Sequence, residues 1–175
     1  ASDSNSNGEN RNTSDHTRLI TALATLHMAS GNRQQQRRLL GKEPHIILIL
    51  CDDLGYSDLG CYGGEIQTPN IDALAEIGVR YTQFMNTSRC CPSRASLLSG
   101  KYPHHVNMGW MTAVDEHRDG YRGELSTAYP TLAEILRGAN YATAMSGKWH
   151  LTLDRQIEEP PNGSWPTERG FDQFF

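Results

Sequence analysis

The sequence predicts an α/β domain with a mostly parallel central sheet flanked by helices. Segments of strand length alternate with helical segments in the order strand, helix, strand, helix, helix, strand, which is typical of this fold class. The first apolar segment is continuous rather than alternating, as in strands buried on both faces of a parallel sheet. The composition, with 21% charged and 37% hydrophobic residues, is that of an ordinary globular domain.

The first strand is predicted at residues 45–51, where Ile-Ile-Leu-Ile-Leu runs without a polar interruption and stops at an acidic pair. After a glycine-rich loop, we expect Asn70 to cap a helix that ends before Gly78. Apolar and polar side chains alternate over residues 79–85, which predicts a second strand with one apolar face.

The next helix is predicted to begin near Pro92, because a proline fits the first helical turn, and to end at Gly100. Residues 101–130 are polar and mixed, and we expect an exposed excursion there. A Thr-x-x-Glu capping box predicts a further helix over residues 132–137, and the third strand follows at residues 141–145.

The chain divides into a leader, residues 1–43, and a domain, residues 44–175. Residues 1–17 are rich in Ser, Asn and Asp and are predicted to be disordered. Residues 18–31 form a degenerate signal-like segment with a basic start, a short apolar middle and small residues at its exit. A short amphipathic helix or a linker is the alternative for this segment, and a polar tether at residues 32–43 connects it to the domain.

Composition also limits the partners. The net charge of −4 gives no reason to expect a nucleic-acid partner, and no apolar run approaches the roughly 20 residues that span a bilayer. The chain starts on Ala1 and ends on the aromatic pair Phe174-Phe175, so we expect it to be part of a longer protein. No C-x-x-C pair is present to indicate a zinc site, and four irregularly spaced cysteines do not suggest a disulfide scaffold.

Chemically capable residues follow each predicted strand. They are Asp52 and Asp53 after the first, Cys90 and Arg94 after the second, and Lys148 and His150 after the third. Ligands of open α/β sheets bind beyond the carboxyl ends of the strands, so we expect these side chains to share one site. Carboxylates suit hard cations, an arginine can fork onto an oxyanion, and a histidine can move a proton near neutral pH. An anionic ester is the substrate that such a set fits.

These residues lie in motifs that resemble the sulfatase family, whose fold is that of the alkaline-phosphatase-like superfamily. Five motifs occur in the family's order: Asp52 to Gly55 with Asp58 to Gly63, Thr68 to Asp72, Cys90 to Arg94 with Leu98 to Gly100, Gly147 to His150, and Gly170 to Phe175. The resemblance implies that residues 44–175 form the N-terminal part of an arylsulfatase-like catalytic domain.

In this family the first cysteine of the signature is oxidised by a maturation enzyme to formylglycine (3-oxoalanine), whose hydrate is the nucleophile. One hydroxyl attacks sulfur and releases the alcohol, and the other then expels sulfate and restores the aldehyde. The resemblance implies that Cys90 is this precursor and that Cys91, at the variable position, keeps its thiol. It further implies that Asp52, Asp53 and the converted Cys90 bind a divalent metal, Ca²⁺ in preference to Mg²⁺.

The resemblance also implies roles for the residues that would contact the anionic substrate. Arg94 is implied to steady the hydrate, and Lys148 and His150 to contact the nucleophile or the sulfate of a small-molecule or carbohydrate ester. The family's later Asp-Asn or Asp-Gln metal ligands and its second His and Lys are missing, so the domain is expected to be incomplete. A formylglycine-dependent phosphodiesterase or phosphonate monoester hydrolase, or an inactive truncated fragment, remains an alternative. The signal-like segment predicts a periplasmic or secreted protein.

Overall fold

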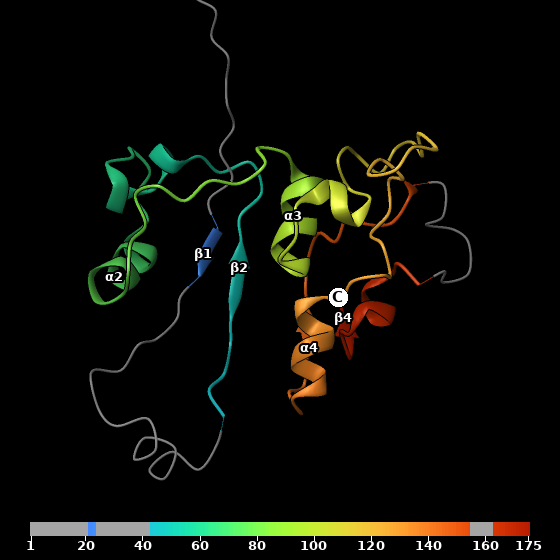
Figure 1. The fold of residues 1–175 in the computed structure, drawn as a ribbon. Helices are drawn as coiled ribbons and strands as arrows, with labels where there is room; N and C mark the ends of the chain where they lie inside the picture. The colour runs from blue at the N-terminus through green and yellow to red at the C-terminus, as the bar shows by residue number, and fades with distance from the viewer. Residues whose placement is uncertain (1–20, 24–42, 155–162) are drawn as a thin grey trace, which may run out of the picture.

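A computed structural model describes residues 21–23, 43–154 and 163–175 (Figure 1). The predicted disorder of residues 1–17 and the polar tether at 32–43 lie outside the described residues, apart from Glu43. The signal-like segment lies outside them too, except for strand β1 (Thr21–Leu23). No helix in the described part of the chain is long and apolar enough to cross a membrane.

The described strands form two small sheets, one antiparallel and one parallel. β1 pairs antiparallel with β2 (Leu48–Leu50), with Ala22 opposite Ile49. β3 (Ala144–Met145) and β4 (Gln173–Phe174) pair in parallel, with Ala144 opposite Gln173. The third strand, predicted at residues 141–145, comprises only the two residues of β3; its parallel pairing is as expected, whereas the first strand has an antiparallel neighbour.

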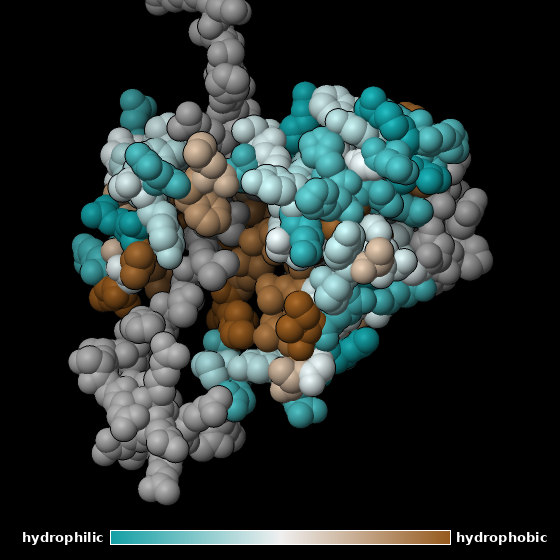
Figure 2. Space-filling model, in the orientation of Figure 1, coloured by the Kyte–Doolittle hydropathy of each residue, from teal (hydrophilic) through white to brown (hydrophobic). Residues whose placement is uncertain are grey.

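The first strand is shorter and more exposed than the sequence predicts. Only three of the residues at 45–51 are in β2, and Ile46, Ile47 and Ile49 are 54%, 68% and 54% exposed. Burial of this segment on both faces was therefore a wrong prediction for the described residues, because β1 is its one hydrogen-bonded neighbour among them. Figure 2 shows apolar side chains gathered on the face that carries β2 and α4.

The three predicted helices are present. Helix α2 (Pro69–Ile77) ends where the Gly78 N–H donates to the Leu74 carbonyl. It begins before Asn70, the predicted cap, because Pro69 occupies the first turn and Thr68 takes the N-cap position.

Helices α3 (Cys90–Ser99) and α4 (Leu132–Gly138) match the predictions to within two residues, since α3 starts before Pro92 and α4 includes Gly138. Gly100 closes α3 in the left-handed conformation, with φ of 66°. At the start of α4, the Thr131 hydroxyl accepts from the Glu134 N–H at 3.1 Å, and the Glu134 carboxylate accepts from the Thr131 N–H.

Residues 79–85 do not form the predicted second strand. Val79, Tyr81 and Met85 are 71%, 60% and 89% exposed, and no described strand pairs with them. An alternating pattern stabilises a strand only when a neighbour supplies hydrogen bonds and a surface for its apolar face.

The core lies behind α3, and residues 101–130 contribute much of it. Val106, Met108 and Leu125 are buried there and form one cluster with other buried residues, namely Cys91 and Ala95 of α3, Trp149 and Leu151. The expected exposed excursion is therefore wrong. Its backbone is also tied down, because the Leu125 N–H donates to the Leu151 carbonyl and the Asp154 N–H to the Thr112 carbonyl.

A buried arginine joins this segment to the C-terminal part of the domain. Arg169, in the short 3-10 helix Pro166–Arg169, is 2% exposed. Its guanidinium donates to the Leu125, Ser126 and Tyr129 carbonyls and pairs with Glu134 at 3.3 Å. These bonds hold α4 and the residues after β3 in fixed positions beside the core.

Candidate active site

All three predicted sets of polar residues meet at one carboxylate. Asp52, which follows β2, accepts from the Arg94 guanidinium at 3.1 Å and from the Lys148 ammonium at 2.8 Å. The Lys148 hydrogen bond is the main cause that lowers the pKa of Asp52, and Arg94 adds to it against the opposing effect of burial. Asp52 is therefore an anion between two cations.

Arg94 reaches this position from the first turns of α3. Its side chain is only 7% exposed, and the guanidinium also donates to the Lys148 carbonyl. One planar group therefore holds both the carboxylate after β2 and the backbone after β3. The same geometry keeps Arg94 beside Lys148 while Asp52 offsets their like charges.

Lys148 is the more accessible of the two cations. Its side chain is 40% exposed, and the Asp52 hydrogen bond raises the pKa of its ammonium group. It is charged at neutral pH and lies at the surface, where an anionic ligand could exchange for the carboxylate.

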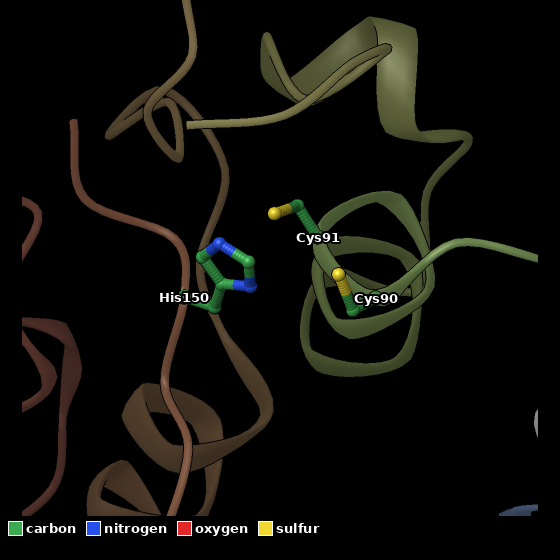
Figure 3. A group of neighbouring side chains, drawn as sticks. All are labelled: Cys90, Cys91 and His150. Atoms are coloured by element: carbon green, nitrogen blue, oxygen red, sulfur yellow. The ribbon is translucent and has the colours of Figure 1, made fainter. Parts of the chain in front are cut away.

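The start of α3 brings two thiols against His150. The Sγ atoms of Cys90 and Cys91 and a ring nitrogen of His150 all lie within 4.8 Å of one another (Figure 3). Burial raises the pKa of the Cys91 thiol to about 11, so this side chain is a neutral thiol in the core at neutral pH. Cys90 is partly exposed, which makes it the accessible sulfur of the pair.

His150 is held in an unusual backbone conformation. Its φ is 58°, in the left-handed region that non-glycine residues seldom occupy. Next to it, Trp149 is buried, and its indole N–H donates to the Ser164 carbonyl at 2.9 Å. Burial, followed by the charge of Lys148, lowers the pKa of His150, so its imidazole is neutral at neutral pH.

Asp53 is the second predicted metal ligand. It is exposed, it has a left-handed φ of 53°, and its carboxylate has no hydrogen bond or ion pair to any described residue. Asp52 and Asp53 offer the hard oxygen donors of a divalent cation, and in this respect they fit the implied metal. Among the described residues they do not form a close three-ligand group with Cys90, so they supply only part of a coordination shell.

The domain belongs to a known family. The sulfatase family model matches residues 44–175. The chain belongs to the sulfatase family. It is 44% identical over 138 residues to human arylsulfatase A, an alignment that covers 77% of this chain and 25% of that protein. Arylsulfatase of Klebsiella aerogenes is 35% identical over 160 residues, covering 90% of this chain and 32% of that protein.

A solved structure has the same fold. The crystal structure of Ps i-CgsB matches with a TM-score of 0.55 and 32% identity, covering 70% of this chain and 25% of that chain. The predicted α/β fold class of the sulfatases is thereby confirmed. The sulfatase chain spans between about a quarter and a third of the length of these relatives.

Sequence reasoning missed one residue of the candidate site. Cys91 was assigned only to the variable signature position, yet its sulfur faces the same space as the Cys90 sulfur and the His150 imidazole (Figure 3). Its position next to Cys90 at a helix start was the available signal. Two adjacent side chains in the first turn of a helix can both lie near the segment that packs against that end.

Proposed function

We propose that this chain is the N-terminal part of a sulfuric ester hydrolase whose nucleophile derives from Cys90. The observation that carries the proposal is the meeting of Asp52, Arg94 and Lys148 beside the start of α3, where Cys90 is the accessible thiol. A carboxylate between two cations, next to a helix N-terminus, is an arrangement suited to an anionic ester and a metal. The motif resemblance described above supports the same assignment.

The proposed roles follow from position and charge. Conversion of Cys90, a free cysteine in this structure, to formylglycine would supply a hydrated aldehyde as the nucleophile at the start of α3. Arg94, fixed by Asp52 and the Lys148 carbonyl, offers its positive charge at the mouth of the helix. Lys148 is accessible enough to contact sulfate oxygens, and the neutral imidazole of His150 can accept a proton beside Cys90. The net reaction cleaves the ester with water to give an alcohol and sulfate.

Asp52 and Asp53 would hold the divalent metal, with Ca²⁺ as the proposed ion in preference to Mg²⁺. A bound cation would supply a positive charge that stabilises the anionic groups at the site. The chain's contribution is to present two carboxylates at the end of β2, one of them already oriented by Arg94 and Lys148. Further oxygen ligands would have to come from outside the described residues.

Conversion of Cys90 is tested first. The chain is co-expressed with a formylglycine-generating maturation enzyme, the proposed partner, and the peptide that carries residues 90–94 is analysed by mass spectrometry. We expect an aldehyde at Cys90 and an unmodified thiol at Cys91. An intact Cys90 under conditions that convert a known substrate would contradict the proposed nucleophile.

Turnover is tested on the longer protein that carries this chain. We expect hydrolysis of an aryl sulfate that is abolished by Cys90→Ala and retained by Cys61→Ala, since Cys61 lies in a separate short 3-10 helix, Gly60–Tyr62. Preferential hydrolysis of an aryl phosphodiester would replace the sulfatase assignment with a phosphodiesterase. Turnover by the longer protein but not by this chain alone, after full conversion of Cys90 in both, would identify the chain as an inactive fragment.

We also propose a periplasmic or secreted location from the signal-like segment, which cell fractionation would test.

A further inference from the structure

The cluster at the start of α3 contains donors of a different kind from the carboxylates of Asp52 and Asp53. Two cysteine sulfurs and a histidine nitrogen lie within 4.8 Å of one another. A tetrahedral zinc site with Zn–S bonds of about 2.3 Å places its sulfur atoms about 3.8 Å apart. The three side chains can therefore reach a common ion with small rotations, without a change in the path of the backbone.

His150 provides an independent observation that points to a ligand. Its Nδ1 atom is buried and has no hydrogen-bond partner among the described residues. In Figure 3 the imidazole lies across from the two sulfurs, on the irregular segment after β3, whereas the two cysteines lie on α3. A buried ring nitrogen without a partner is costly, and a metal ion at this position would remove that cost.

We propose that, before Cys90 is converted, Cys90, Cys91 and His150 bind one Zn²⁺ ion. Thiolate and imidazole donors select a borderline-soft transition metal over Ca²⁺ or Mg²⁺, which take oxygen ligands. Binding displaces the protons of both thiols to solvent, so two thiolates balance the two charges of the ion. Three protein ligands leave a fourth tetrahedral position for water.

Zinc binding and formylglycine formation exclude each other at this site. The ion engages the Cys90 sulfur, which is the atom that conversion removes, and a converted chain retains only Cys91 and His150 as donors. The zinc proposal concerns the unconverted thiol, so it stands or falls separately from sulfate ester hydrolysis.

The test uses the reduced chain expressed without a maturation enzyme. Co²⁺ serves as a spectroscopic substitute for Zn²⁺, because thiolate ligation gives it a charge-transfer absorption that oxygen ligation does not. We expect this absorption to saturate at one Co²⁺ per chain and to be displaced by one equivalent of Zn²⁺. Native mass spectrometry with Zn²⁺ provides the stoichiometry independently.

Two variants and a control identify the ligands. Cys91→Ala and Cys90→Ala should each weaken Zn²⁺ binding by more than the roughly 10- to 100-fold that loss of a supporting group costs. Cys61→Ser should bind as the parent does. Cys90 is partly exposed, so Cys90→Ala decides the question even if the buried Cys91→Ala variant fails to fold. Absence of the thiolate absorption, or equal affinity in the parent and Cys90→Ala, would overturn the proposal.

Discussion

The Arg94 guanidinium donates to the Asp52 carboxylate at 3.1 Å, although 42 positions separate the two residues in the sequence. Because the same side chain is almost fully buried and also holds the Lys148 carbonyl, it joins the ends of β2 and β3 to helix α3. The side chain that we propose to bind the anion is thus also a structural crosslink.

Replacing this crosslink tests its contribution to stability. Arg94→Lys keeps the charge but loses the planar fork, which leaves either Asp52 or the Lys148 carbonyl without its donor. We expect the free energy of unfolding in urea to fall by roughly 1–3 kcal/mol. Arg118→Lys is the matched control, because Arg118 makes an exposed pair with Glu116 and such pairs contribute about 0–1 kcal/mol. Equal effects of the two substitutions would show that Arg94 is not a crosslink.

Gly170 offers a test of how the C-terminal segment packs against α4. Its φ is 95°, and a Cβ atom there would lie within 3 Å of the Glu134 and Ala133 backbone. Gly63 has a φ of 91° but has no atom within 4 Å of the same position. We expect Gly63→Ala to cost about 1–2 kcal/mol of unfolding free energy from backbone strain alone, and Gly170→Ala to cost clearly more.

Thermal or urea unfolding of the two glycine variants separates strain from contact. The difference between them measures the collision with α4, since the left-handed conformation is common to both positions. If both variants lose the same stability, the close approach of residue 170 to α4 is wrong.

Sequence reasoning succeeded where local chemistry decides the structure. Proline and glycine positions and a capping box placed three helices to within a few residues. Asp52, Arg94 and Lys148 also lie together as expected, although the strand predicted before Arg94 does not form and β2 and β3 belong to different sheets. The helix signals depend only on neighbours in sequence. They need no knowledge of the rest of the fold.

Sequence reasoning failed where packing against distant segments decides the structure. The pattern at residues 79–85 favoured a strand, but no described strand pairs with it. The polar segment at 101–130 was expected to be exposed, but it contributes Val106 and Met108 to the core. Cys91 was likewise passed over, since its proximity to His150 arises from the packing of α3 against a segment 59 positions away. Such contacts cannot be derived from local patterns.

Asp115 predicts a specific dependence of stability on pH. Two hydrogen bonds from Arg122, and then the His117 N–H, lower the pKa of Asp115 to about 2 in the folded protein. The unfolded value is about 3.9, so the unfolded state takes up the proton first as the pH falls. The contribution of Asp115 is complete above about pH 4 and is lost progressively between about pH 4 and pH 2.

Asp115→Asn should remove this acid-dependent part of the unfolding free energy. The measurement is urea unfolding at a series of pH values across that window, and the variant should show a shallower decline than the parent. Asp119→Asn, which changes an exposed carboxylate in the same loop, should keep the parent's slope. A parent-like slope in Asp115→Asn would mean that the Arg122 pair does not contribute to acid stability.

Lys148 tests the proposed function most directly. Lys148→Met keeps much of the side-chain length but removes the ammonium group that faces Asp52 and, in the proposal, the sulfate. Loss of one charge-stabilising donor costs about 10²- to 10³-fold in turnover, and we expect a fall of this size in kcat/KM for an aryl sulfate in the longer protein. Lys101→Met is the control, because Lys101 lies beyond the end of α3 over the Tyr129 ring. If the two variants turn over the ester equally well, Lys148 does not contact the reacting group. A selective loss in Lys148→Met, with normal conversion of Cys90, supports the role of Lys148 at the sulfate.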